Sequence, residues 1–202
     1  MNSEDLKLHL PQYLGELEQR RLLEQLGDFQ EHREKIYSDE LLNEDEIHQG
    51  DALGDLFLFN LPDVETKEGP AVVVSNSCDV NSENRRFVPS RLLYSPLIDF
   101  NKLTAFLIEK FENQKNAVDS YLKAIQNQTV SNVLFFPQGE FNSFEGPKVV
   151  FLDNIISVKL DSLELKSVNT RRLFALNNLG FYLFVFKLSV HFTRIRENVN
   201  RG

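Results

Sequence analysis

Cysteine and acidic side chains follow a valine run in the stretch PAVVVSNSCDV, where the chain's only cysteine, Cys78, precedes Asp79. A cysteine becomes a nucleophile when a nearby histidine or arginine stabilises its thiolate. His48, Arg85 and Arg86 are the partners that the sequence offers. The alternative is a small buried side chain at a strand end, with Asp79 bonding the backbone of the next turn. Because no histidine motif accompanies the thiol, we expect Cys78 to be buried and inert.

Basic side chains form a second group with a chemical use, because they neutralise phosphate, and two serines at the end of the valine strand are expected to rim a groove. The predicted binding residues are Ser75, Ser77, Arg85, Arg86, Arg171, Arg172, Arg194 and Arg196. Phenylalanines near the C-terminal arginines would allow stacking on bases. The alternative is a solvated helix face that pairs with the acidic N-terminal part of the chain.

Charge is unevenly spread along the 202 residues, whose formal net charge is −8. Residues 1–60 carry 15 acidic and 5 basic side chains, and the rest carry 15 acidic and 17 basic ones. We therefore expect the acidic N-terminal part to pack against the basic C-terminal region or against a second copy. The expected partner is a protein or a second copy of the chain. Nucleic acid remains an alternative, although an acidic protein is repelled by phosphate at long range.

Cofactor, metal and membrane signals are weak. The four histidines lie far apart, without the spacing of metal ligands, and no glycine-rich phosphate loop occurs. We therefore expect no metal and no cofactor. A single cysteine cannot form an internal disulfide, which favours a reducing, cytoplasmic location. The most apolar run, residues 179–192, is shorter than a membrane-spanning helix, so no membrane contact is expected.

Hydrophobic patterning predicts the α+β class. Helices are expected at 11–36 and, after a cap at Ser38, to about residue 45. Strands are expected at 54–62, 71–77 and 86–98, and in the segments VSNVLFFP, KVVFL and IISVKL. A helical insertion is predicted at 101–128 and a C-terminal helix from about residue 169. The domain prediction is an acidic helical extension at 1–49, a small, strongly bent β-barrel at 50–165, and a basic helix at 166–202 packed on it.

A resemblance to a known family rests on the stretch GDLFLFNLPDVETKEGPAVVVS. It resembles the opening of the PemK/MazF-like toxins, bacterial growth inhibitors that cleave RNA. The matching positions are Gly54, Asp55, Pro62, Pro70, Ala71 and Ser75. The later LLYSPLI is similar to the family's next strand. The resemblance implies an SH3-like barrel. The Ser-x-x-Cys-Asp pattern also resembles a group of uncharacterised bacterial proteins.

Two departures from the family pattern concern catalysis. The family places an arginine before the proline, where this chain has Gly69 preceded by Glu68. The family's catalytic threonine falls near Ile98 or Asp99. Phosphodiester cleavage builds negative charge that such groups must stabilise. We therefore expect a catalytically degenerate binding module in a bacterial toxin–antitoxin or phage-defence setting. The alternatives are an active endoribonuclease with relocated catalytic residues, such as Arg85 and Arg86, and a Cys78-dependent enzyme.

Overall fold

The computed structural model describes residues 17, 35–60, 62, 65–81, 83–84, 87–163 and 168–193. The predicted N-terminal helix lies almost entirely outside this part of the chain. The same holds for four of the predicted site residues, Arg85, Arg86, Arg194 and Arg196.

The larger sheet has six strands, and every neighbouring pair is antiparallel. In spatial order these are β1 (Tyr37–Ser38), β9 (Arg172–Leu176), β2 (Ala52–Phe59), β3 (Thr66–Val73), β4 (Arg91–Pro96) and β8 (Ile156–Lys159). The predicted strands at 54–62 and 71–77 correspond to β2 and β3. β3 starts earlier than expected, because residues 66–69 pair with β2 instead of forming a polar loop.

The smaller sheet has three antiparallel strands in the order β5 (Ile98–Asp99), β7 (Lys148–Phe151) and β6 (Val133–Phe136). Only Leu97 separates β4 from β5, so one stretch of chain runs through both sheets. Two hydrogen bonds lie at the junction: the Leu97 N–H donates to the carbonyl oxygen of Pro70 and the Ser95 hydroxyl to that of Phe151, each at 2.8 Å. The α+β class is thus confirmed, but the described strands form two joined sheets and not a closed barrel.

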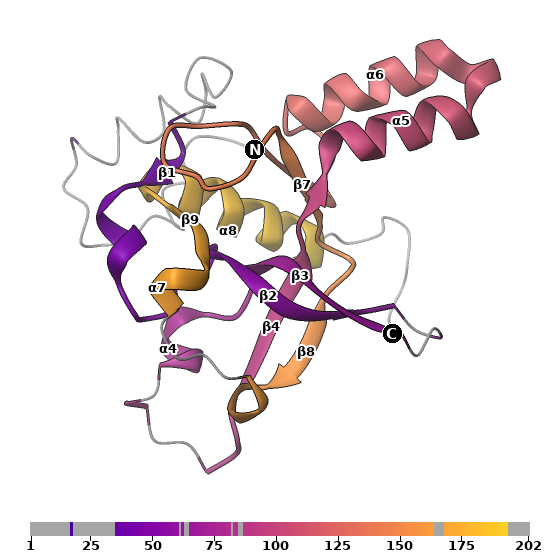
Figure 1. Cartoon of the computed structure of the whole chain (residues 1–202). Coiled ribbons are helices and arrows are strands. Elements are labelled where there is room, and N and C mark those ends of the chain that lie inside the picture. The colour runs from indigo at the N-terminus through magenta and orange to yellow at the C-terminus, as the bar shows by residue number, and fades with distance from the viewer. Residues whose placement is uncertain are drawn as a thin grey trace, which may run out of the picture.

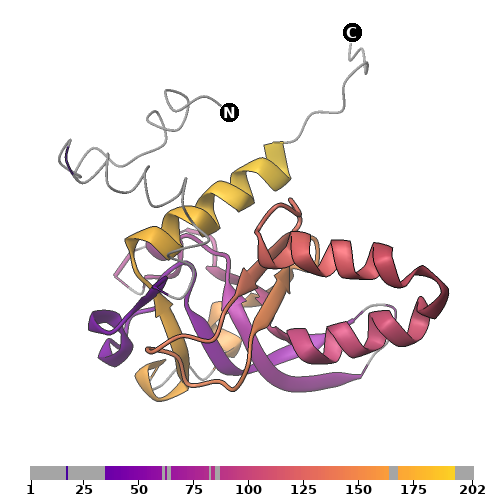
Figure 2. The same cartoon turned by 90° about the horizontal axis from the view of Figure 1, so that it is seen from above.

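The helical insertion is a hairpin. α5 (Phe100–Lys110) and α6 (Lys115–Gln126) are separated by the 3₁₀ turn η2 (Glu112–Gln114). α5 begins where the Asp99 side chain accepts the Lys102 N–H at 2.9 Å, which caps the helix. Only one face is buried, through Val118, Leu122 and Ile125 against the smaller sheet. The hairpin therefore projects from the sheets in both views (Figures 1 and 2).

The C-terminal helix α8 (Asn178–Thr193) covers the main core. Phe184 is fully buried there with Phe136 and Phe174. The helix was predicted, but it begins later than residue 169, because 172–176 form the strand β9. Its first turn passes so close to the segment before β1 that a Cβ on Gly180 would lie 2.3 Å from the carbonyl oxygen of Ile36. Only glycine fits this crossing.

A buried lysine joins α8 to the end of the helical hairpin. Lys187 is 4% exposed, and its ammonium donates to the carbonyl oxygens of Gln128 at 3.0 Å, Val130 at 2.8 Å and Val133. Burial lowers the pKa of Lys187 to about 8. These bonds hold the turn after α6 against the core.

Four short helices lie outside the sheets: η1 (Glu40–Asn43), α4 (Ser77–Val80), η3 (Leu160–Ser162) and α7 (Val168–Arg171). The expected helix after Ser38 is thus reduced to η1. Strand β2 carries a bulge beside α7, where Asp55 has φ 54° and the pairing with β3 shifts between Leu53 and Leu56. The Arg171 guanidinium donates to the carbonyl oxygen of Asp55. The Gly-Asp dipeptide of the family resemblance therefore forms this bulge.

Candidate binding pocket

A pocket of about 680 Å³ lies between three parts of the chain: the stretch before β2, the α4 region, and the described residues of and beside η3 and α7. The first segment contributes Asp45, Glu46 and Ile47. The second contributes Ser77, Cys78, Val80, Asn81 and Asn84. The third contributes Leu160, Asp161, Leu163 and Val168. Each part contributes apolar side chains that belong to one hydrophobic cluster, and we call this cluster the floor of the pocket: Ile47, Val80, Leu160, Leu163 and Val168.

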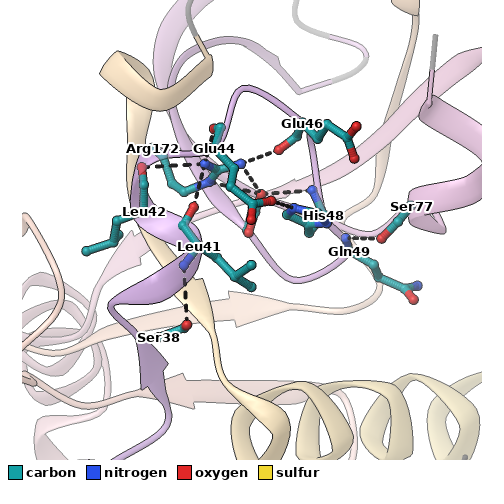
Figure 3. A network of polar contacts seen from close by, with 10 residues as sticks. Ser38, Leu41, Leu42, Glu44, Glu46, His48, Gln49, Ser77 and Arg172 are labelled. Atoms are coloured by element: carbon teal, nitrogen blue, oxygen red, sulfur yellow. Dashed lines mark hydrogen bonds and ion pairs between the residues drawn. The ribbon is translucent and has the colours of Figure 1, made fainter. Parts of the chain in front are cut away.

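The wall formed by residues 44–51 is fixed from inside by Arg172, the first residue of β9. Arg172 is 5% exposed. Its guanidinium donates to the carbonyl oxygen of Leu41 at 2.8 Å and to those of Glu44 and Glu46, as Figure 3 shows. Because a guanidinium has five donors in a fixed plane, one side chain sets the path of the whole segment.

Asp51 neutralises this buried arginine. Its Oδ2 lies 3.0 Å from Nη2 and 3.1 Å from Nε of Arg172, and it also accepts the His48 N–H at 2.8 Å. Burial raises the pKa of Asp51, while Arg172 and the His48 N–H oppose that shift. The backbone of Asp51 pairs with β3 through Val73 N–H at 2.8 Å. The wall is therefore attached to β3 by this backbone hydrogen bond and to β9 by the side chain of Arg172.

The second wall begins at α4. The Asn76 side chain caps this single turn by accepting the Cys78 N–H at 2.9 Å. The Ser77 hydroxyl accepts the Gln49 N–H at 2.9 Å, which joins α4 to the first wall (Figure 3). Ser77 therefore lines the pocket and also fixes its shape.

Cys78 is exposed and lines the pocket. The expectation of a buried thiol is wrong, because the strand ends before Asn76 and the chain turns into α4. Val80 takes the buried position of that turn instead. The carbonyl oxygen of Cys78 accepts a hydrogen bond from the Asn84 amide.

The expected partners of the thiol are not assembled around it in the described part of the chain. His48 is not among the pocket-lining residues, and its ring bonds the Glu44 carboxylate at 2.9 Å. Asp79 is exposed and contributes to a neighbouring hollow of about 700 Å³ that includes Phe87 and Arg91. His48, the one expected partner that the structure describes, therefore does not pair with Cys78.

Ser75 and Arg172, two of the predicted binding residues, serve the fold. Ser75 is 6% exposed, and its hydroxyl accepts the Leu93 N–H at 2.8 Å and donates to the carbonyl oxygen of Arg91 at 3.3 Å. Arg172 is in the interior, away from the surface on which it was expected to contact phosphate. Arg171 is partly exposed and bonds the β2 bulge.

The pocket has an acidic mouth. Asp45 and Glu46 are exposed on one wall and Asp161 on another. The described residues that line it include no lysine, arginine or histidine. Sequence reasoning missed these carboxylates, because they are isolated along the chain and only the fold brings them together. The Asp51–Arg172 pair was missed for the same reason, since 121 positions separate its members.

Within the described residues no group of three or more histidine, cysteine, aspartate or glutamate side chains could hold a metal ion. No helix in that part of the chain is both long and apolar enough to cross a bilayer. Comparison with protein-family models finds no match, and comparison with curated proteins finds none either.

Proposed function

We propose that the chain is a catalytically degenerate, PemK/MazF-like protein that acts as a binding module and not as a nuclease. The observation that carries this proposal is the space around Gly69. A Cβ at this position would lie 2.8 Å from Cδ1 of Leu58. The Leu58 side chain packs over Gly69, where the resemblance expects an arginine, and the acidic side chain of the neighbouring Glu68 is exposed.

The second catalytic position of the family supports the same conclusion. Asp99 stands near the place of the threonine, caps α5, and lies 2.8 Å from the Lys148 ammonium. The hydrogen bond from Lys148 lowers the pKa of Asp99, so the side chain is an anion at neutral pH. An anion at this position repels the phosphate that a nuclease must stabilise.

The relationship to the PemK/MazF-like fold is part of the proposal. It rests on the sequence resemblance, whose Gly54–Asp55 dipeptide forms the bulge in β2. A bacterial, cytoplasmic role in toxin–antitoxin or phage-defence systems follows from the resemblance alone. The binding site within this module is the pocket beside Cys78, because its walls are fixed and it is open to ligands.

The nuclease test is incubation of the purified full chain with mixed-sequence RNA in the absence of metal. We expect no cleavage. Specific cuts that disappear in the Arg85→Ala or Arg86→Ala variant would overturn the proposal in favour of an endoribonuclease with relocated residues. A Gly54→Ala variant serves as the control for unspecific loss of activity.

A second candidate function, a Cys78-dependent enzyme, is favoured by one observation: the thiol is exposed inside a pocket. The probe is p-nitrophenyl acetate, which acylates accessible thiols. Release of many equivalents of nitrophenol, lost in the Cys78→Ser variant, would establish turnover. Release of a single equivalent would mean an accessible thiol without catalysis, as the binding-module proposal expects.

A further inference from the structure

The pocket beside Cys78 combines an apolar floor, an acidic mouth and rigid walls. We propose that it takes a lysine or arginine side chain from a basic segment of a partner protein. This inference rests on the proposed function, because it names the ligand of the same site.

The charge of the mouth selects a cation. Asp45 and Glu46 line the pocket from one wall, and Asp161 lines it from another. Arg172, which holds the wall from inside, is already neutralised by Asp51 and directs its remaining donors to backbone oxygens. It therefore does not compensate the three carboxylates. A positive ligand would remove their mutual repulsion.

The floor selects a ligand with an apolar stem. Val80, Leu163 and Val168 are buried there, and Ile47 and Leu160 are partly buried beside them. Lysine and arginine carry three or four methylene groups below the charged head and bury these stems along apolar surfaces. A small inorganic cation would leave the floor uncovered, whereas a basic side chain uses both parts of the pocket.

The walls are formed before any ligand arrives. Arg172 holds the backbone at Glu44 and Glu46, and the Ser77–Gln49 hydrogen bond joins the two walls. A preformed site loses less conformational entropy on binding, so a single side chain can contribute measurable affinity. Because the same carboxylates repel phosphate, a protein segment fits this pocket and a nucleic acid does not.

The experiment measures binding of labelled peptides to the full chain by fluorescence anisotropy at low and high salt. The probe is an amidated hexapeptide of alternating arginine and leucine, and the comparison probes replace arginine by glutamine or by glutamate. We expect the arginine peptide to bind more tightly than both. The triple variant Asp45→Asn/Glu46→Gln/Asp161→Asn should bind the arginine peptide at least tenfold more weakly than the unaltered chain does.

A matched control separates the pocket from the general negative charge of the protein. The variant Glu109→Gln/Glu112→Gln/Asp119→Asn removes three exposed acids from the helical hairpin instead. It should bind the arginine peptide within twofold of the unaltered chain. Equal weakening by both triple variants would overturn the proposal, as would tighter binding of a mixed-sequence RNA.

Cys78 reports occupancy of the pocket independently of affinity. The arginine peptide should slow labelling of Cys78 by N-ethylmaleimide. It should do so equally in the unaltered chain and in the hairpin variant Glu109→Gln/Glu112→Gln/Asp119→Asn. Equal protection by the glutamine peptide would overturn the preference for a cation and leave the pocket as the binding site. No protection by any peptide, together with RNA cleavage, would reject the proposed function itself.

Discussion

Arg172 and Asp51 form a buried ion pair between β9 and the start of β2, with Nη2 and Oδ2 3.0 Å apart and 121 sequence positions between them. The pair lies behind the pocket wall and fixes it, because Arg172 also binds the backbone of residues 41–46.

Replacing Arg172 by methionine should destabilise the protein by about 3–5 kcal/mol, because Asp51 would keep a buried charge without a partner. Denaturant unfolding measures the change. Arg91→Met is the matched control: Arg91 is exposed and bonds Ser157 at the sheet edge, so its loss should cost less than about 1 kcal/mol. A similar decrease in the free energy of unfolding for Arg172→Met and Arg91→Met would contradict a special role for the buried pair.

Gly180→Ala should destabilise the chain by about 1–3 kcal/mol, because the new methyl group would overlap the backbone of Ile36. Gly54→Ala provides the comparison, since a Cβ there would lie at an ordinary 3.6 Å from the carbonyl oxygen of Arg171. Thermal unfolding of the two variants tests the close crossing of α8. If the Gly180→Ala variant has the same melting temperature as the unaltered protein, α8 and the segment at Ile36 do not pass this close to each other.

Lys187 gives stability a pH dependence of defined sign. Its pKa is about 8 in the folded protein, against 10.5 for a free side chain. Between these values the unfolded chain binds more protons at this residue, so the free energy of unfolding rises with pH. The free energy of unfolding of the unaltered protein minus that of the Lys187→Met variant should therefore increase from pH 7 to pH 9.5. A constant or shrinking difference would mean that Lys187 titrates normally.

Cys78 should react with a disulfide reagent in the native protein at a rate within about tenfold of the unfolded chain, because its side chain is exposed. One equivalent is expected, since the chain has one cysteine. Absorbance during reaction with Ellman's reagent gives both values. Labelling that requires denaturant would restore the earlier expectation of a buried thiol.

Local sequence patterns predicted most of the strands, and the reason is visible in β6, whose four residues are all buried. Such apolar runs between turn residues are strong signals. β9 was missed because its residues RLFAL directly follow a helical turn, and only pairing with β1 and β2 makes them a strand. The strand conformation of β9 is therefore set by its tertiary contacts and not by the intrinsic preference of its residues.

The pocket was only partly predictable. Ser77 and Cys78 attracted attention because polar side chains follow a buried strand. The acids opposite them gave no signal, because Asp45 and Asp161 are 116 positions apart in the sequence. The exposure of Cys78 depends on the turn at Asn76, whose capping bond is visible only in the folded chain.

The position of Arg172 far behind residues 41–51 in the sequence also determines when the pocket can form during synthesis. The ribosome makes residues 41–51 early, but their backbone oxygens must wait for a guanidinium that is added 121 positions after Asp51. Domains generally fold as units, so this wall takes its final path only after β9 has been made. A chain that stops before residue 172 would contain residues 44–51 but would lack the guanidinium that fixes their path in the pocket wall.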